Sequence, residues 1–149
     1  MKFRCGDLGL VLAVTVCACS RYSTHPAVLV ARSDTAELNV PASVRAGEPF
    51  SVSVSVFAGG CTREVARAEV AVRRDTAEIR PVMRRRDADV CTADLLILRE
   101  RVELRFDTPG MAVVRAVGVR EGPPADSSGQ AYTVPVRLER RVRVLPSTP

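Results

Sequence analysis

Apolar and polar residues alternate along several stretches of the chain, most regularly in residues 49–61, PFSVSVSVFAGGC. The apolar residues share one parity and the serines share the other: Phe50, Val52, Val54 and Val56 against Ser51, Ser53 and Ser55. A period of two is typical of a strand with one buried face and one solvated face. Gly59 and Gly60 then indicate a turn directly before Cys61. The pattern predicts the β-strand against which the other elements pack.

Further stretches with the same period follow at short intervals, separated by turn residues. Pro81 favours a sheet edge for its strand, because proline has no N–H to donate. The most apolar stretch is expected to be the central strand, and the last strand is expected to bend near Arg140. We predict strands at 35–40, 76–83, 95–106, 111–119 and 131–145, a short edge strand at 27–30, turns at 42–48 and 107–110, and loops at 84–89 and 120–130.

Residues 63–73 allow two interpretations. Ala, Glu and Arg are good helix formers, so a helix is one of them. The apolar residues of this stretch nevertheless share one parity: Ala66, Ala68, Val70 and Val72. We favour a strand that turns this face to the core.

About seven strands at short, regular spacing predict an all-β domain, with antiparallel strands in a sandwich or a barrel. Over residues 35–145 this architecture resembles an immunoglobulin-like β-sandwich of bacterial envelope proteins. The resemblance is architectural and implies no functional residue. The expected organisation is a signal peptide at 1–18, a tether at 19–34, the β-sandwich at 35–145 and a tail at 146–149.

Composition and charge agree with one globular domain. The chain has 149 residues, of which 46% are hydrophobic and 26% are charged. Aromatic residues make up only 4%, so the core must consist of Val, Leu, Ile and Ala. The net charge is +5, or +4 without residues 1–18, and basic and acidic residues are interspersed. Nucleic-acid binding favours a concentrated basic stripe, so a nucleic-acid partner is not expected.

The first residues indicate where the protein goes. Lys2 and Arg4 precede an apolar run of 11 residues at 8–18. A membrane-spanning helix needs about 20 apolar residues, whereas a run of this length suits a secretory signal peptide. The sequence Val16-Cys17-Ala18-Cys19 then resembles the lipobox of bacterial lipoproteins.

This resemblance implies cleavage after Ala18 and lipid attachment to Cys19, on its sulfur and its amine. Ser20, the next residue, implies sorting to an outer membrane. The protein is therefore expected to be exported and held in the cell envelope by lipid on Cys19. Plain secretion is the alternative, because Val16 and Ala18 also suit an ordinary signal peptidase, which would leave Cys19 free.

Cys61 and Cys91 are the only cysteines after Cys19. An exported chain meets an oxidising compartment, so we expect these two to form a disulfide. A redox or metal site is the alternative. A metal would require His or further Cys nearby, and the sole histidine, His25, falls in the expected tether. No metal and no cofactor are expected.

Arg84, Arg85 and Arg86 form the one local charge cluster, which we call the arginine triplet. Guanidinium groups bind phosphates and carboxylates, so these residues are candidate contacts for an anionic ligand. A solvated loop, partly neutralised by Asp87 and Asp89, is the alternative. The loop at 120–130 is a second candidate by its position.

No catalytic group is predicted, because the sequence offers no nucleophile, base and orienting residue together. The expected function is that of a non-enzymatic, membrane-anchored envelope lipoprotein. Its β-sandwich would act as a structural module or bind another envelope protein. The alternative is a binder of anionic envelope polymer or small ligand through the arginine triplet.

Overall fold

In the computed structural model, residues 22–30, 38–121 and 133–147 are described, and every regular element within them is a β-strand. The expected all-β class is confirmed, with ten strands in the described residues where we expected about seven. The strands are β1 Tyr22–Pro26, β2 Val28–Leu29, β3 Leu38–Asn39, β4 Ser43–Arg45, β5 Phe50–Gly59, β6 Thr62–Arg73, β7 Thr76–Arg86, β8 Leu95–Leu104, β9 Gly110–Glu121 and β10 Thr133–Leu145.

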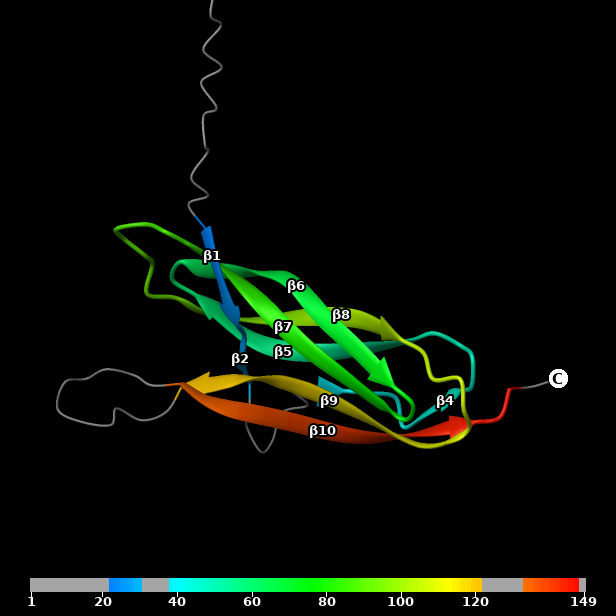
Figure 1. Cartoon of the computed structure of the whole chain (residues 1–149). Coiled ribbons are helices and arrows are strands. Elements are labelled where there is room, and N and C mark those ends of the chain that lie inside the picture. The colour runs from blue at the N-terminus through cyan, green and yellow to red at the C-terminus, as the bar shows by residue number, and fades with distance from the viewer. Residues whose placement is uncertain (1–21, 31–37, 122–132, 148–149) are drawn as a thin grey trace, which may run out of the picture.

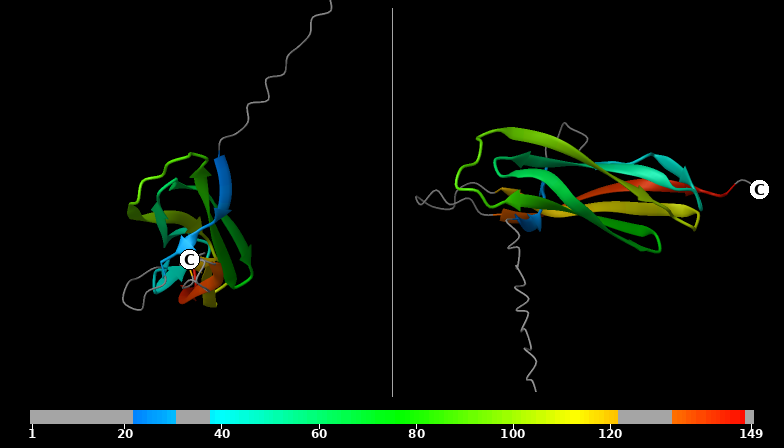
Figure 2. Two further views of the ribbon diagram at one scale, coloured as in Figure 1. Left: turned by 90° about the vertical axis from the view of Figure 1, so that its left-hand side faces the viewer. Right: turned by 90° about the horizontal axis from the view of Figure 1, so that it is seen from above.

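Three long antiparallel pairs form the body of the domain: β5 with β8, β6 with β7, and β9 with β10. Two links join them. β7 and β9 pair in parallel over residues 76–79 and 113–116, and β2 pairs with both β5 and β9. These links close the sheet on itself, with β5 to β8 above β9 and β10 in Figure 1. The view along the strands in Figure 2 shows them around one interior.

The interior confirms the strand predicted from the serine–valine alternation. Val52, Val54 and Val56 of β5 are fully buried. Ser55 departs from the pattern, because it is only 7% exposed although it shares the parity of the exposed Ser51. The core around β5 contains the following side chains from other segments: Leu29, Leu38, Ala77, Ile79, Met83, Leu104, Phe106, Ala112, Val114, Ala116, Val142 and Val144. Aliphatic side chains dominate this core, as the composition predicted.

The segment expected to be a tether enters the sheet instead. β1 pairs antiparallel with the end of β7, and β2 lies between β5 and β9. Ala27, Leu29 and Val30 are almost fully buried. The edge strand expected at 27–30 is therefore an interior link. The first described strand begins at Tyr22, and the expected signal peptide at 1–18 lies outside the described residues.

β6 settles the choice between helix and strand, because all of Thr62–Arg73 is strand. Val70 lies opposite Ile79 and Val72 lies opposite Ala77, so both valines share the face of these two buried residues. They are nevertheless 42% and 46% exposed. Beyond Thr62, β6 pairs only with β7 among the described strands, so no strand of the described residues covers this face along its free edge.

Pro81 lies inside the sheet, contrary to the prediction of an edge. β6 flanks β7 on one side, and β1 and β9 flank successive parts of its other side. Pro81 falls between those two parts, where its carbonyl accepts the Ala27 N–H at 3.0 Å. Since proline has only an acceptor to offer, a position that needs no donor tolerates it.

Three further expectations need correction. The predicted loop at 84–89 begins only after residue 86, because the arginine triplet belongs to β7. The bend expected near Arg140 is absent: β10 pairs with β9 in unbroken register from Thr133 to Val144, with Arg140 opposite Val114. The turn predicted at 42–48 includes β4, which pairs in parallel with β10. Of the loop at 120–130, residues 122–130 lie outside the described residues.

Candidate functional site

The structure brings Cys61 and Cys91 to disulfide distance, with their Cα atoms 5.1 Å apart. The pair joins the β5–β6 turn to the connection between β7 and β8. Arg63 holds the same connection, because its Nη2 atom donates to Thr92 Oγ1 and to Asp94 Oδ2, each at 2.6 Å. This end of the domain therefore combines a cysteine pair at disulfide distance with side-chain hydrogen bonds between the same two segments.

The hydrogen bond from the Thr92 hydroxyl lowers the pKa of Asp94 below its usual value, and the Gly60 N–H and the charge of Arg63 act in the same direction. The carboxylate therefore stays ionised at neutral pH. Its ion pair with Arg63 is exposed, so solvent screens the attraction and the pair adds little to the stability of the fold. The disulfide, rather than this pair, is expected to dominate the local stability.

Replacing both Cys61 and Cys91 by Ser is expected to lower the free energy of unfolding by roughly 3–4 kcal/mol, because the bond closes a loop with a sequence separation of 30. Urea unfolding of the full chain measures the loss. Wild-type protein under reducing conditions is the matched control and should lose a similar amount. An unchanged midpoint in both would contradict a stabilising bond.

The arginine triplet lies on β7 opposite the first residues of β1, with Tyr22 opposite Arg86. Alternation along the strand places Arg84 and Arg86 on one face and Arg85 on the other. Arg84 pairs with Glu64 at 3.0 Å, and its guanidinium carbon lies 5.7 Å from the Tyr22 ring centroid. Arg85 therefore lies on the opposite face of β7 from Arg84 and Arg86.

Two grooves flank the triplet, one on each face. A groove of about 390 Å³ is lined by Arg84 and Arg86, with Tyr22, Val90 and Cys91 among its other residues. The groove on the other face has about 670 Å³. Its walls include the following residues: His25, Phe57, Arg85, Asp94 and Leu95.

His25 belongs to this second groove rather than to a solvated tether. It lies on β1 opposite Met83 and is half-buried. Its Nε2 atom lies 3.3 Å from Thr62 Oγ1, and its Nδ1 atom lies 3.0 Å from the Pro26 carbonyl oxygen. The ring thus links β1 to the start of β6. Sequence periodicity did not indicate this role, because residues 20–34 have no regular pattern.

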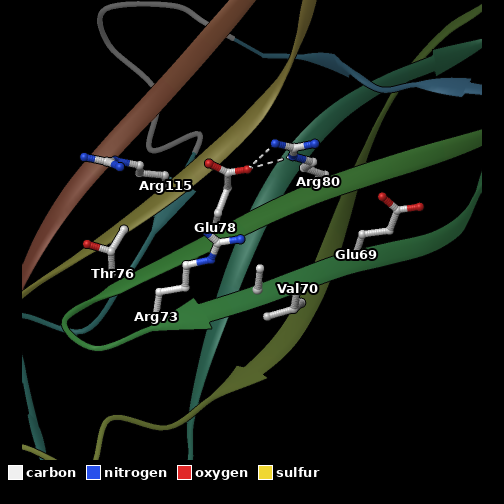
Figure 3. Close-up of a pocket in the computed structure, with 8 residues that line it drawn as sticks. Glu69, Val70, Arg73, Thr76, Glu78, Arg80 and Arg115 are labelled. Atoms are coloured by element: carbon white, nitrogen blue, oxygen red, sulfur yellow. Dashed lines mark hydrogen bonds and ion pairs between the residues drawn. The ribbon is translucent and has the colours of Figure 1, made fainter.

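A third groove, of about 600 Å³, crosses the outer face of β6, β7 and β9 (Figure 3). Sequence analysis missed it, because its residues come from three strands that are not all consecutive. Arg80 pairs with Glu78 at 2.6 Å, and Arg115 pairs with Glu139 of β10 at 2.7 Å. Most of its charged side chains are thus already paired, and an anion entering this groove would compete with their carboxylates.

Neither metal ligation nor a membrane-spanning helix emerges from the part of the chain that the structure describes. No group of three or more His, Cys, Asp or Glu side chains there is arranged to hold a metal ion. A search of the same residues for a helix long and apolar enough to cross a membrane finds none.

Comparisons with known proteins identify no relative. No family model matches the chain, and neither the curated proteins nor the solved structures contain a match. A functional assignment therefore rests on the sequence and on the surfaces described above.

Proposed function

We propose that this chain is a non-enzymatic envelope lipoprotein, anchored by lipid on Cys19, whose β domain binds a second envelope protein. The observation that carries the proposal is the order of three features: a short apolar run at 8–18, the sequence ending in Cys19, and a globular β domain directly after it. Ser20 favours the outer membrane as the site of anchoring. No cofactor and no nucleic acid take part in this proposal.

For the architecture, we propose the immunoglobulin-like sandwich that the sequence resembles. The arrangement of the long pairs supports this description. β5 and β8, with β3 beside them, form one group, and β6, β7, β9 and β10, with β4 beside them, form the other. The β7–β9 and β2 links are then the places where the two groups join.

The free edge of β6 is the surface we assign to the protein partner. Val70 and Val72 are exposed there beside main-chain groups that no described strand pairs. An extended segment of a partner can add to such an edge, with main-chain hydrogen bonds for affinity and apolar side chains against the valines. Exposed valines on the core-facing side of a strand favour a strand-like partner over a flat surface.

We expect in-cell cross-linking of a tagged full chain to recover one dominant partner. Replacing Val70 and Val72 by Asp should reduce this yield roughly tenfold or more, the effect of losing about 1.4 kcal/mol of binding free energy. Met111→Asp is the matched control, because Met111 is similarly exposed, at 55%, but lies on β9 rather than β6. This variant should keep the yield.

Failure to recover any partner, with the protein abundant and folded, would contradict the interaction proposal and favour the alternative, an anionic-polymer binder using the arginine triplet. The specific observation in its favour is that Arg85 and Arg86 make no ion pair with any described residue. Such binding would weaken with salt and would disappear when all three arginines are replaced by Ala.

A further inference from the structure

The distance between the expected lipid and the first strand is short. Only three residue steps separate Cys19 from Tyr22, the first residue of β1. Three residues span at most about 11 Å when fully extended. If Cys19 carries lipid, as the proposed function holds, Tyr22 must lie within about this distance of the membrane surface. The domain therefore has no freedom to stand far from the bilayer.

The elements that share the end of the domain with Tyr22 are the end of β7 and the connection at 87–94. Tyr22 lies opposite Arg86, and it lines one groove together with Val90. Figures 1 and 2 show the start of β1 and the β7–β8 connection at the same end of the strands, and the end of β10 at the opposite end. We call the surface formed by Tyr22, the arginine triplet, Val90 and Leu95 the anchor end.

Large apolar side chains are unusually exposed at the anchor end. Val90 is 86% exposed, Leu95 is 71% exposed and Tyr22 is 52% exposed. Ile97 lies on the same face of β8 as Leu95, and its side chain is 56% exposed. Surfaces that lie in the headgroup region of a bilayer combine exposed aliphatic side chains with amphipathic residues such as Tyr, and the anchor end has this composition.

The charges of the anchor end are nearly balanced. The basic side chains in and beside it are Arg63 and the arginine triplet. The neighbouring acidic side chains are Glu64, Asp87, Asp89 and Asp94. Two of the arginines are paired, Arg63 with Asp94 and Arg84 with Glu64. Arg85 and Arg86 remain to contact lipid phosphates. Because the net charge is close to zero, apolar insertion rather than long-range attraction must hold this end on the bilayer.

We propose that the anchor end lies flat on a phospholipid surface, with Val90 and Leu95 inserted at the level of the headgroups. This inference rests on the proposed lipid anchor, which brings the surface into reach. It fixes how the domain is oriented: the anchor end faces the bilayer, and the end of β10 points away from it.

The test uses the lipidated protein, purified from cells, in phosphatidylcholine vesicles with brominated acyl chains. A single cysteine introduced by Leu95→Cys carries an environment-sensitive fluorophore, and Met111→Cys, at the opposite end of the strands, is the matched control. The label at position 95 should be quenched roughly twofold or more, as at the boundary between headgroups and acyl chains, and the label at 111 should not. Val90→Asp should reduce the quenching at 95 without changing thermal unfolding, because Val90 packs against little.

Equal quenching at the two positions, or none at 95, would overturn the proposal. Loss of quenching in 1 M salt would also overturn it, because that result would indicate electrostatic binding to phosphate. Flotation with the vesicles and the intact mass of the protein test the anchor separately. A lipidated, floating protein with an unquenched label at 95 would leave the lipoprotein proposal standing and refute the docking. A quenched label on a chain without lipid would refute the lipoprotein proposal and leave the docking standing.

Discussion

Cys19→Ser is expected to transfer the protein from the membrane fraction of cells to the soluble fraction. The sulfur of Cys19 is the proposed attachment point, and a serine hydroxyl there removes it. Each acyl chain buries many methylene groups at about 0.8 kcal/mol apiece, so a chain with several of them is held almost irreversibly and a chain without them is not. Fractionation, followed by immunoblotting of both fractions, measures the change.

Cys17→Ser is the matched control, because serine is an ordinary small residue at this position of a lipobox and should leave anchoring intact. Persistence of the Cys19→Ser protein in the membrane fraction would mean that lipid is not the anchor. Wild-type protein found in the soluble fraction with a free Cys19 thiol would instead support plain secretion.

Gly59→Ala is expected to cause a large loss of folding stability. A Cβ atom at Gly59 would lie 2.0 Å from the carbonyl oxygen of Asp94, and the backbone there has φ +154°. The obstructing atom belongs to the main chain just before β8, and Gly59 itself pairs with Leu95. Relief of the clash must therefore separate β5 from β8. The expected cost is about 3 kcal/mol or more, measured by urea unfolding.

Gly47→Ala is the matched control, because it distinguishes the effect of the steric clash from the effect of the backbone conformation. Gly47 also has a positive φ, of +80°, but an added Cβ would meet no atom within 4 Å. Its cost should be confined to the left-handed conformation, about 1–2 kcal/mol. Equal losses in the two variants would show that the contact with Asp94 has no part in the effect.

The two proposed surfaces do not compete for the same side chains. The anchor end lies near Thr62, where β6 begins, whereas Val70 and Val72 lie toward its other end. A domain docked on the bilayer would therefore still present the free edge of β6 to a protein partner. Because the link from Cys19 is short, the domain could bind only partners that lie close to the membrane surface.

The sequence by itself determined the strand class and most of the long strands. The alternation in β5, the apolar run of β9 and the spacing of turn residues are local properties, because successive side chains of any strand point to opposite faces. The pairing of Cys61 with Cys91 followed from counting cysteines after the expected export signal. The lipid anchor expected at Cys19 is likewise inferred from the sequence and stays a prediction.

Only the tertiary structure decided which faces are covered. Residues 22–30 have no period, yet Ala27 and Leu29 are buried because β5 and β9, far along the chain, close over them. Val70 and Val72 have the pattern of core residues but remain exposed because no described strand pairs with the free edge of β6. Burial depends on neighbours distant in sequence, and local periodicity records only the direction in which each side chain points.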